Sequence, residues 1–416
     1  MKPLRRVGAD RFIHVILRQE RYRICDNYTR FYLKCIEPNR AIIERGLFQL
    51  AAQAYRNRWQ IERKVSTGFG TVRKVFSPSV FRGLAKIRDN LSLKVRDKRV
   101  RHAPYPLRLH TCYNIGMTVN ELNARYGAPG RIVFREGFAG YPDVVIANKY
   151  GTATVALLGG NVLSYRPTGH SEVLFRPAKR DYNRADKVHC GIPVCWPQFG
   201  SRFSKDLPQH GFARLLVFEV RGTEYSDEMT EVTLGLRSDD ETNKLWNHDF
   251  DLELKVSVSM KLNLSLKTTN TGVAPFDFNC GFHPYFLVRD RNAVTVRGFD
   301  GCTFVNGLSG KAEGPQQGDL TVDSEVDHIF DLPPAPKHEF AIVDPGLGRA
   351  IALVSSGNTK TVVWNPDMRN VMPDHTADDW RKFLCVEPVS NWPGGGTLAP
   401  GASHELLAAI QAILKV

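Results

Sequence analysis

Two ionisable residues lie within short apolar segments of the chain, where a charged side chain is costly to bury. His283 lies in Cys-Gly-Phe-His-Pro-Tyr-Phe, residues 280–286, and Glu387 lies in Phe-Leu-Cys-Val-Glu-Pro, residues 383–388. A histidine is a suitable acid near neutral pH, and a carboxylate is a suitable base. The two segments therefore predict an acid–base pair that the fold brings together. Each residue taken alone is also compatible with a structural role, as a hydrogen-bonded core histidine or as a paired carboxylate.

A third segment has the residues to bind an anionic or hydroxyl-rich ligand. It reads Leu-Pro-Gln-His-Gly-Phe-Ala-Arg, residues 207–214. Gly211 allows the backbone to pass close to a ligand. The Arg214 guanidinium offers a planar fork of donors for a phosphate or for paired hydroxyls. The alternative is a surface loop with a structural arginine.

The longer part of the chain predicts β-structure. From Leu252 to Leu266 an apolar residue occupies every second position, which predicts one half-buried strand or a hairpin of two. Short helices are expected at 239–246 and 378–383. Many strands separated by closely spaced turns predict an all-β fold, an antiparallel sandwich with few short helices. Shorter strands are expected at 144–146, 154–158, 215–220, 231–236, 294–296, 350–354 and 361–364.

Charge divides the chain into two parts. The whole chain has a formal net charge of +13, and residues 1–116 alone hold 26 Lys and Arg against 8 Asp and Glu. Residues 117–416 hold the other 30 basic and 35 acidic residues, a mildly acidic balance typical of an ordinary enzyme domain. Three interpretations of the basic segment remain open: a nucleic-acid-binding extension, an organelle transit segment, or an extension that lies upstream of the true start.

Met117 stands directly before a sequence that predicts a helix start. Thr118 followed by Glu121 forms a capping box, and Gly127 is expected to end the short helix. We therefore interpret 1–116 as a basic N-terminal extension, either disordered or wrongly assigned to the protein, and 117–416 as one β-sandwich domain that folds without it. A helix-like stretch at 40–55 and a basic run at 86–102 are the parts of the extension that could bind nucleic acid or the acidic domain.

The three segments, in this order, resemble the hexose-6-phosphate mutarotases, or glucose-6-phosphate 1-epimerases, of the aldose 1-epimerase superfamily. The resemblance extends from about Met117 to Val416. It implies a large antiparallel β-supersandwich of the galactose-mutarotase type. It also implies interconversion of the α and β anomers of a hexose 6-phosphate, such as glucose 6-phosphate, by acid–base-catalysed ring opening and reclosure. That chemistry needs neither a cofactor nor a metal.

The resemblance assigns roles to particular residues. His283 would protonate the ring oxygen of the sugar, and Glu387 would take the proton of the anomeric hydroxyl. Asp327 lies in the stretch Glu-Val-Asp and would bind a sugar hydroxyl, the alternative being a surface turn. His210 would steady the sugar or orient its loop. The positions assigned to substrate binding are Gln209, His210, Arg214 and Asp327.

One position departs from the family pattern. Residues 189–193 resemble a family stretch that reads Arg-Gly-Gly-Ile-Pro, in which the arginine contributes to the anionic-sugar site, but this chain has His189 there. A histidine is only partly charged near neutral pH, so phosphate binding should be weaker or supplied by Lys187, Arg202 or Lys205. Two alternatives follow: an aldose 1-epimerase for unphosphorylated sugar, or a non-catalytic carbohydrate-binding protein, which would have no need of an acid and a base.

The sequence contains no motif for a metal ion or a nucleotide cofactor. The His and Cys residues form no zinc-ligand motif, and no glycine-rich segment is a phosphate loop, so we expect no metal and no cofactor. No apolar run approaches the ~20 residues of a membrane helix, and the signal-peptide pattern is absent. We expect a cytoplasmic monomer or weakly associating enzyme with reduced thiols, whose partner is a small sugar phosphate. Three tryptophans could stack on a sugar face, but core packing is the default interpretation for each: Trp196, Trp364 and Trp380.

Overall fold

The computed structural model describes residues 117–137, 140–177, 189–201, 203–368, 372, 374–390 and 396–414. The segment 1–116, with its stretches at 40–55 and 86–102, lies outside these described residues, as do Lys187 and Arg202. The division of the chain at Met117 therefore stays a prediction. Within the described ranges, no helix is long and apolar enough to cross a membrane.

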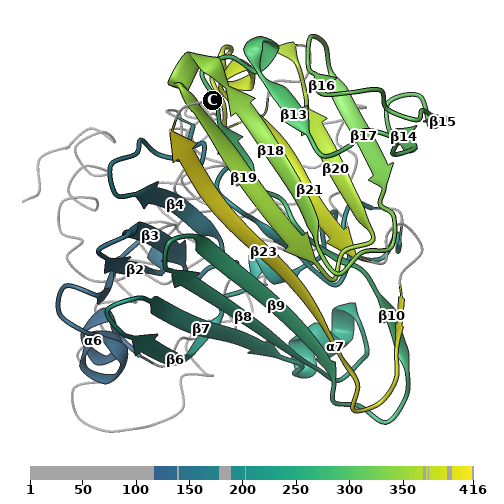
Figure 1. Ribbon diagram of the computed structural model, residues 1–416. Helices are drawn as coiled ribbons and strands as arrows, with labels where there is room; N and C mark the ends of the chain where they lie inside the picture. The colour runs from purple at the N-terminus through teal and green to yellow at the C-terminus, as the bar shows by residue number, and fades with distance from the viewer. Residues whose placement is uncertain are drawn as a thin grey trace, which may run out of the picture. The chain divides into compact units, whose positions relative to one another are not determined.

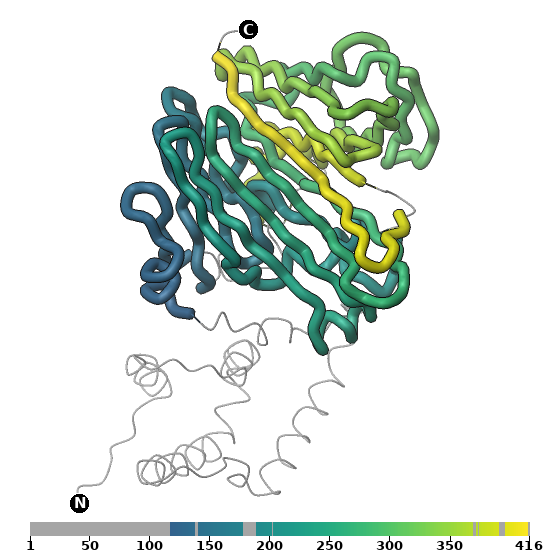
Figure 2. Tube along the Cα trace, turned by 60° about the horizontal axis from the view of Figure 1, so that its bottom comes forward, coloured from purple at the N-terminus to yellow at the C-terminus, as the bar shows by residue number. Residues whose placement is uncertain are grey.

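A nine-stranded antiparallel sheet is the largest layer of the described part of the chain. It faces the viewer in Figure 1. The C-terminal strand, drawn in yellow in Figure 2, runs through its middle between β9 and β19. In spatial order the strands are β16 (Leu320–Thr321), β13 (Thr295–Arg297), β18 (His338–Asp344), β19 (Arg349–Ser356), β23 (Ser403–Leu414), β9 (Leu262–Asn270), β8 (Phe250–Val258), β7 (Thr230–Arg237) and β6 (Glu219–Tyr225).

A second antiparallel sheet of eight strands carries two of the predicted site residues, Asp327 and Glu387, and His283 lies between two of its strands. Its central strand is β21, which pairs with β20 on one side and with both β11 and β12 on the other. In spatial order the strands are β15 (Lys311–Glu313), β14 (Phe304–Asn306), β17 (Val326–Asp331), β20 (Lys360–Asn365), β21 (Phe383–Ser390), β11 (Cys280–Phe282) and β5 (Val194–Cys195), with β12 (Tyr285–Leu287) beside β21.

Two smaller sheets complete the β-structure of the described ranges. A four-stranded sheet packs against β7 and β8 of the largest layer and consists of β1 (Ile132–Glu136), β2 (Pro142–Asn148), β3 (Gly151–Ala156) and β4 (Val162–Pro167). A two-stranded sheet pairs β10 (Phe276–Phe278) with β22 (Gly396–Leu398). The predicted all-β, antiparallel architecture is confirmed.

The alternating stretch from 252 to 266 forms a hairpin rather than one long strand. Strands β8 and β9 bury the alternate residues of one face and pair in register from Phe250–Asn270 to Val258–Leu262. Met260 had the spacing of the buried face, but it lies in the turn and its side chain is 64% exposed. Residues within a tight turn leave the two-residue period of the strands on either side.

The predicted helix start at Thr118 is confirmed. Helix α6 (Val119–Tyr126) begins with a complete capping box, in which the Glu121 N–H donates to Thr118 Oγ1 at 3.3 Å and the Thr118 N–H donates to Glu121 Oε2 at 2.6 Å. Gly127 ends the helix in an extended conformation rather than a left-handed one. A Cβ atom at this position would lie 2.5 Å from the Asn123 carbonyl oxygen, so close packing explains the glycine.

The other expected helices and one expected strand differ in detail. Helix α7 (Asp240–Leu245) falls within the predicted 239–246. The predicted helix at 378–383 is a 3-10 helix, η9 (Asp379–Lys382), and it ends before Phe383 because that residue begins β21. The strand predicted at 215–220 is wrong over most of its length, since an apolar run is equally compatible with a buried connection. Among the described residues, the other 3-10 helices are η5 (Ala213–Leu215), η6 (Arg291–Ala293) and η7 (Pro345–Leu347).

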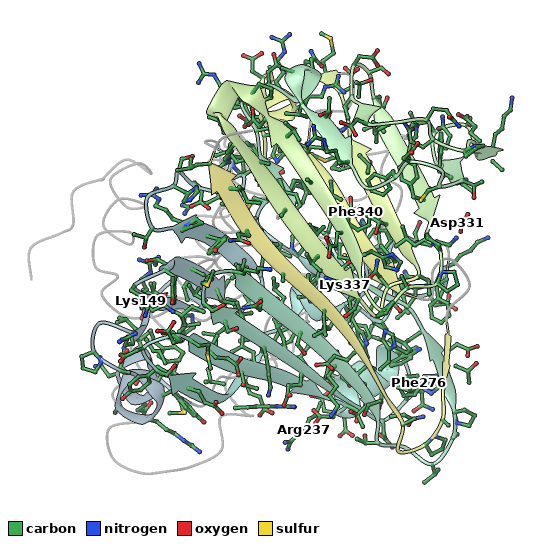
Figure 3. The ribbon with its side chains drawn as sticks, in the orientation of Figure 1. Lys149, Arg237, Phe276, Asp331, Lys337 and Phe340 are labelled. Carbon is green, nitrogen blue, oxygen red and sulfur yellow. The ribbon has the colours of Figure 1, made fainter. Side chains whose placement is uncertain are left out.

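The two faces of the eight-stranded sheet have different roles. One face belongs to the main apolar core, and Phe330 of β17 connects there to Phe340 of β18 through Phe299. The ring centroids are 4.1 Å apart for Phe299–Phe330 and 4.7 Å apart for Phe299–Phe340, a stack that ends at the Phe340 labelled in Figure 3. The opposite face holds only small apolar clusters, around Ile329 and Tyr285, and leaves room for a site.

Candidate active site

The strand register places His283 directly across from Glu387. Strand β11 pairs Gly281 with Val389, and β12 pairs Tyr285 with Cys385, so the register is the same on both sides of the break between β11 and β12. When this register is continued through the break, His283 lies opposite Glu387. Residues directly opposite in an antiparallel pair point to the same face and come into contact. The two apolar segments therefore bring their ionisable side chains together on the open face of the sheet.

The contact between the two side chains is close and buried. His283 Nε2 lies 3.5 Å from Glu387 Oε2, and the residues are 8% and 1% exposed. The His283 backbone N–H donates to the Pro193 carbonyl oxygen at 3.1 Å. The imidazole stacks on the Tyr285 ring with centroids 4.8 Å apart and an angle of 8° between the planes. These contacts fix the ring orientation, which general acid–base catalysis requires.

Burial is the largest influence on the ionisation of both groups. It lowers the pKa of His283 to about 3, and the positive charges of His189 and Arg214 act in the same direction. It raises the pKa of Glu387 well above its usual value, and the Asp327 carboxylate adds to the rise. The site therefore favours a neutral imidazole beside a protonated carboxyl. That state contains as many protons as an imidazolium beside a carboxylate.

A cavity of about 460 Å³ opens over the pair. All six residues predicted for the site, from the catalytic pair to the four substrate-binding positions, lie in its wall. The described residues that line it are His189, Pro193, Cys195, Phe199, Gly200, Ser201, Gln209, His210, Arg214, His283, Tyr285, Asp327, Ile329, Val362, Trp364, Met372 and Glu387. Its volume and its mixed apolar and polar wall suit a small polar molecule.

His210 enters the wall from a strained loop. It has a φ of 62° and is followed by Gly211 with a φ of 70°, so two consecutive residues are left-handed. The Gly200 N–H donates to His210 Nδ1 at 3.2 Å, which makes Nδ1 an acceptor and puts the proton of the neutral ring on Nε2. Burial lowers the pKa of His210 well below its usual value, with His283 adding to the effect. His210 therefore offers a neutral N–H donor.

Arg214 and Gln209 lie on the same side of the cavity. Arg214 stands in η5, and its Nε and Nη2 groups donate to the Gln209 carbonyl oxygen at 3.3 and 3.1 Å. The Gln209 side-chain amide lies 3.4 Å from His210 Nε2. Lys205, the other described candidate for phosphate binding, is exposed and does not line the cavity. Among the described lining residues, the fixed positive charge therefore comes from Arg214.

Asp327 reaches the cavity from β17 on the far side of β20. It pairs with Trp364 in the register, and Trp364 pairs with Cys385, so these side chains share the face of the acid–base pair. The Gly307 N–H donates to the Asp327 carbonyl oxygen at 2.6 Å. A carboxylate at this position can accept hydrogen bonds from hydroxyl groups.

His189, the position that departs from the family pattern, is held by a buried carboxylate. His189 Nδ1 lies 2.7 Å from Asp374 Oδ1, and its backbone N–H donates to Asp374 Oδ2 at 3.1 Å. Burial raises the pKa of Asp374, but the hydrogen bonds from His189 outweigh it and leave that pKa below its usual value. The Asp374 carboxylate offsets any positive charge on the imidazole, so the dyad adds little net charge to the cavity.

A family model described as aldose 1-epimerase matches residues 142–411. The chain belongs to the aldose 1-epimerase family. A protein of Cenchrus ciliaris with the provisional name glucose-6-phosphate 1-epimerase is 32% identical over 250 residues, which cover 57% of this chain and 74% of that protein. Family membership makes the chain an aldose epimerase, in agreement with the resemblance of the three segments.

Two solved structures support the same fold. A Salmonella typhimurium protein provisionally called a mutarotase has a TM-score of 0.64 and 26% identity, over 71% of this chain and 99% of its own. A galactose mutarotase-like protein of Clostridium acetobutylicum has a TM-score of 0.57 and 17% identity, over 68% of this chain and 98% of its own. The second likeness concerns the fold alone. The predicted galactose-mutarotase type of β-supersandwich is confirmed.

Sequence reasoning missed parts of this aldose epimerase cavity. Tyr285 lines it and could have been found, because it lies two residues after His283 in the same extended segment. For Trp364 the default interpretation was core packing, with sugar stacking as the alternative; it lines the cavity because its register position faces the site. Trp196 and Trp380 are buried, as predicted. Asp374 gave no signal, since its partner His189 is 185 residues away.

Proposed function

We propose that the chain interconverts the α and β anomers of a hexose 6-phosphate, with glucose 6-phosphate as the first candidate. The observation that carries the proposal is the contact of His283 Nε2 with Glu387 Oε2 at 3.5 Å in the wall of a cavity with sugar dimensions. The two oxygens that exchange protons in this reaction are both bonded to C1. An acid and a base that touch each other suit two such neighbouring oxygens.

The reaction balances with these two side chains. Glu387 removes the proton of the anomeric hydroxyl while His283 protonates the ring oxygen, so the C1–O5 bond breaks and an aldehyde forms. The aldehyde group rotates, and ring closure on its other face returns both protons to their donors. Opening converts carboxylate and imidazolium into carboxyl and neutral imidazole, the state that burial favours. The low-polarity site therefore stabilises the open-chain step relative to water.

The proton count of the pair predicts the pH dependence of the rate. One shared proton is required, and a second would have to enter beside the buried His283, whose pKa burial lowers to about 3. The acid limb of kcat/KM should therefore lie well below pH 6.5, the ordinary pKa of histidine. The raised pKa of Glu387 moves the alkaline limb upward. Anomer exchange measured by NMR across pH 4–10 checks this.

The substrate's own phosphate titrates near pH ~6 and needs a control. Glucose 6-sulfate keeps one negative charge across the range, so its profile reports the enzyme alone. An acid limb centred near pH 6.5 with both sugars would contradict the assigned ionisation of the pair.

The phosphate group of the substrate would be bound near Arg214. We expect Arg214→Ala to raise KM for glucose 6-phosphate by about 10- to 100-fold, since a hydrogen bond to a charged group contributes about 1.5–3 kcal/mol. KM for glucose should change far less. Initial rates of anomer exchange with the two sugars measure the difference.

Two variants complete this test. Lys205→Ala removes the same charge from an exposed position outside the cavity wall and should leave both KM values unchanged. His189→Arg should strengthen use of the phosphorylated sugar if the family's arginine position contributes to the anion site. A wild-type protein without preference for glucose 6-phosphate over glucose would overturn the hexose 6-phosphate proposal.

The second candidate function is epimerisation of an unphosphorylated aldose. The observation that favours it is the His189–Asp374 dyad. Asp374 Oδ1 lies 2.7 Å from His189 Nδ1, so its negative charge offsets positive charge on the imidazole that could otherwise attract a phosphate. A non-catalytic carbohydrate-binding protein is the weaker alternative, because a binding module has no use for a buried acid–base pair. The proposal also includes a cytoplasmic monomer that needs no cofactor and has a small sugar as its partner.

A further inference from the structure

The acid–base pair has a thiol as its third neighbour. Cys385 lies two residues before Glu387 on β21, so both side chains point to the same face of the sheet, and His283 stands across from Glu387. The ligand atoms of His283, Cys385 and Glu387 all lie within 4.8 Å of one another. Cys385 is completely buried as a free thiol. An imidazole, a thiol and a carboxyl group therefore lie close together on this face.

These three donors match the ligands that zinc prefers. Zn²⁺ binds Cys sulfur, His nitrogen and carboxylate oxygen in a tetrahedron whose ligands stand roughly 3.3–3.7 Å apart. The present atoms lie within 4.8 Å of one another, so side-chain movements of about 1 Å would bring them to that spacing. A thiolate and a carboxylate together carry two negative charges, which neutralise a dication inside a buried site. The sequence held no zinc motif because two of the ligands come from one strand, two residues apart, and the third comes from the break between β11 and β12 beside it.

An ion that enters the cavity meets this site at its wall. His283 and Glu387 both line the cavity, and Cys385 lies beside them in an apolar cluster with Tyr285 and Phe383. We propose that His283, Cys385 and Glu387 form an inhibitory site for Zn²⁺ or another thiol-binding divalent cation. On binding, the ion displaces the proton of the thiol and the shared proton of the pair to solvent. It then holds both groups that the epimerase reaction needs, so the bound enzyme is inactive.

A binding measurement tests the site without reference to catalysis. Co²⁺ is spectroscopically visible in zinc sites, and a thiolate ligand gives a charge-transfer band in the near ultraviolet. The reduced wild-type protein should bind one Co²⁺ with this band, and Zn²⁺ should displace it. Cys385→Ser and Cys385→Ala should both lose the band and weaken Zn²⁺ affinity at least tenfold, measured by competition with a chromophoric chelator. Thermal melts of the apo variants show that they are folded.

Two other cysteines provide the comparison. Cys280→Ser changes a buried thiol on β11 that belongs to the main core on the opposite face, and it should keep the band. Cys195 is the rival, since its sulfur lies 3.4 Å from His210 Nδ1 in the cavity wall. Loss of the band in Cys195→Ser with its retention in Cys385→Ser would overturn the proposal, as would a wild-type protein that gives no thiolate band.

The inhibition rests on the proposed function, and its test is separate. Zn²⁺ should inhibit anomer exchange competitively with the sugar, and a chelator should reverse the inhibition. Cys385→Ser should keep the exchange rate measured without metal and require at least tenfold more Zn²⁺ for the same inhibition. Co²⁺ binding with the predicted band but no effect of Zn²⁺ on exchange would leave the site in place and reject its inhibitory role. An absence of exchange activity in metal-free wild type would reject the proposed function alone.

Discussion

Replacement of His283 by alanine or of Glu387 by glutamine should each reduce the rate of anomer exchange by about 10²–10⁴, the usual contribution of a positioned acid or base. Glu387→Gln keeps the shape of the side chain but removes the base. His283→Ala removes the acid and leaves the carboxyl without its partner at 3.5 Å. NMR exchange spectroscopy between the two anomers of the sugar measures the rates directly.

Both groups transfer protons in the same ring-opening step, so the losses of rate in the two single variants should not be additive. The double variant should be about as slow as the slower single variant, as is found for residues that act as a unit. A rate that falls by the product of the two single effects would indicate independent roles and would argue against a shared pair.

A matched pair of controls lies on another sheet. His338 and Glu339 stand on β18, between the Lys337 and Phe340 that Figure 3 labels, and neither lines the cavity. His338→Ala and Glu339→Gln make the same chemical changes outside the cavity wall. They should leave the rate of anomer exchange unchanged. Exchange near the wild-type rate in either His283→Ala or Glu387→Gln would refute the assigned roles.

The parts of this protein that sequence predicts well are those set by local chemistry. The capping box at Thr118 uses atoms only three residues apart, and it is present as expected. The β8–β9 hairpin follows from one alternating stretch, because each buried residue lies two positions from the next. Only the position of the turn was missed. Met260 is apolar and fits the alternating pattern, but it lies in the turn and is exposed.

The composition of the cavity depends on register between strands that are distant in the chain. His283 meets Glu387, and Asp327 reaches the same face through Trp364, because β12, β21, β20 and β17 pair with particular offsets. A shift of one residue in any pair would turn those side chains to the opposite face. Sequence motifs indicated which residues could belong to one site. Their contacts, and the pairing of His189 with Asp374, do not follow from the spacing of these residues along the chain.

Close backbone approach requires a glycine at position 211, beside the site. Gly211 has a φ of 70°, and a Cβ atom there would lie 2.0 Å from the Trp196 carbonyl oxygen and 2.3 Å from its carbonyl carbon. The obstacle is backbone, which cannot rotate away as a side chain can. Gly211→Ala must therefore displace either the loop that carries His210 or the chain at Trp196, and both lie next to the cavity.

We expect Gly211→Ala to destabilise the protein by about 3 kcal/mol or more, combining the left-handed penalty of about 1–2 kcal/mol with the clash. Gly130→Ala is the matched control: its φ is 73°, but no atom lies within 4 Å of the added Cβ. It should show the conformational penalty alone. Urea unfolding gives both free energies of unfolding, and equal losses in the two variants would show that the close approach to Trp196 is not what requires a glycine. A larger loss at Gly211, accompanied by slower anomer exchange only in that variant, would tie the strained loop to the position of His210 and hence to the chemistry of the cavity.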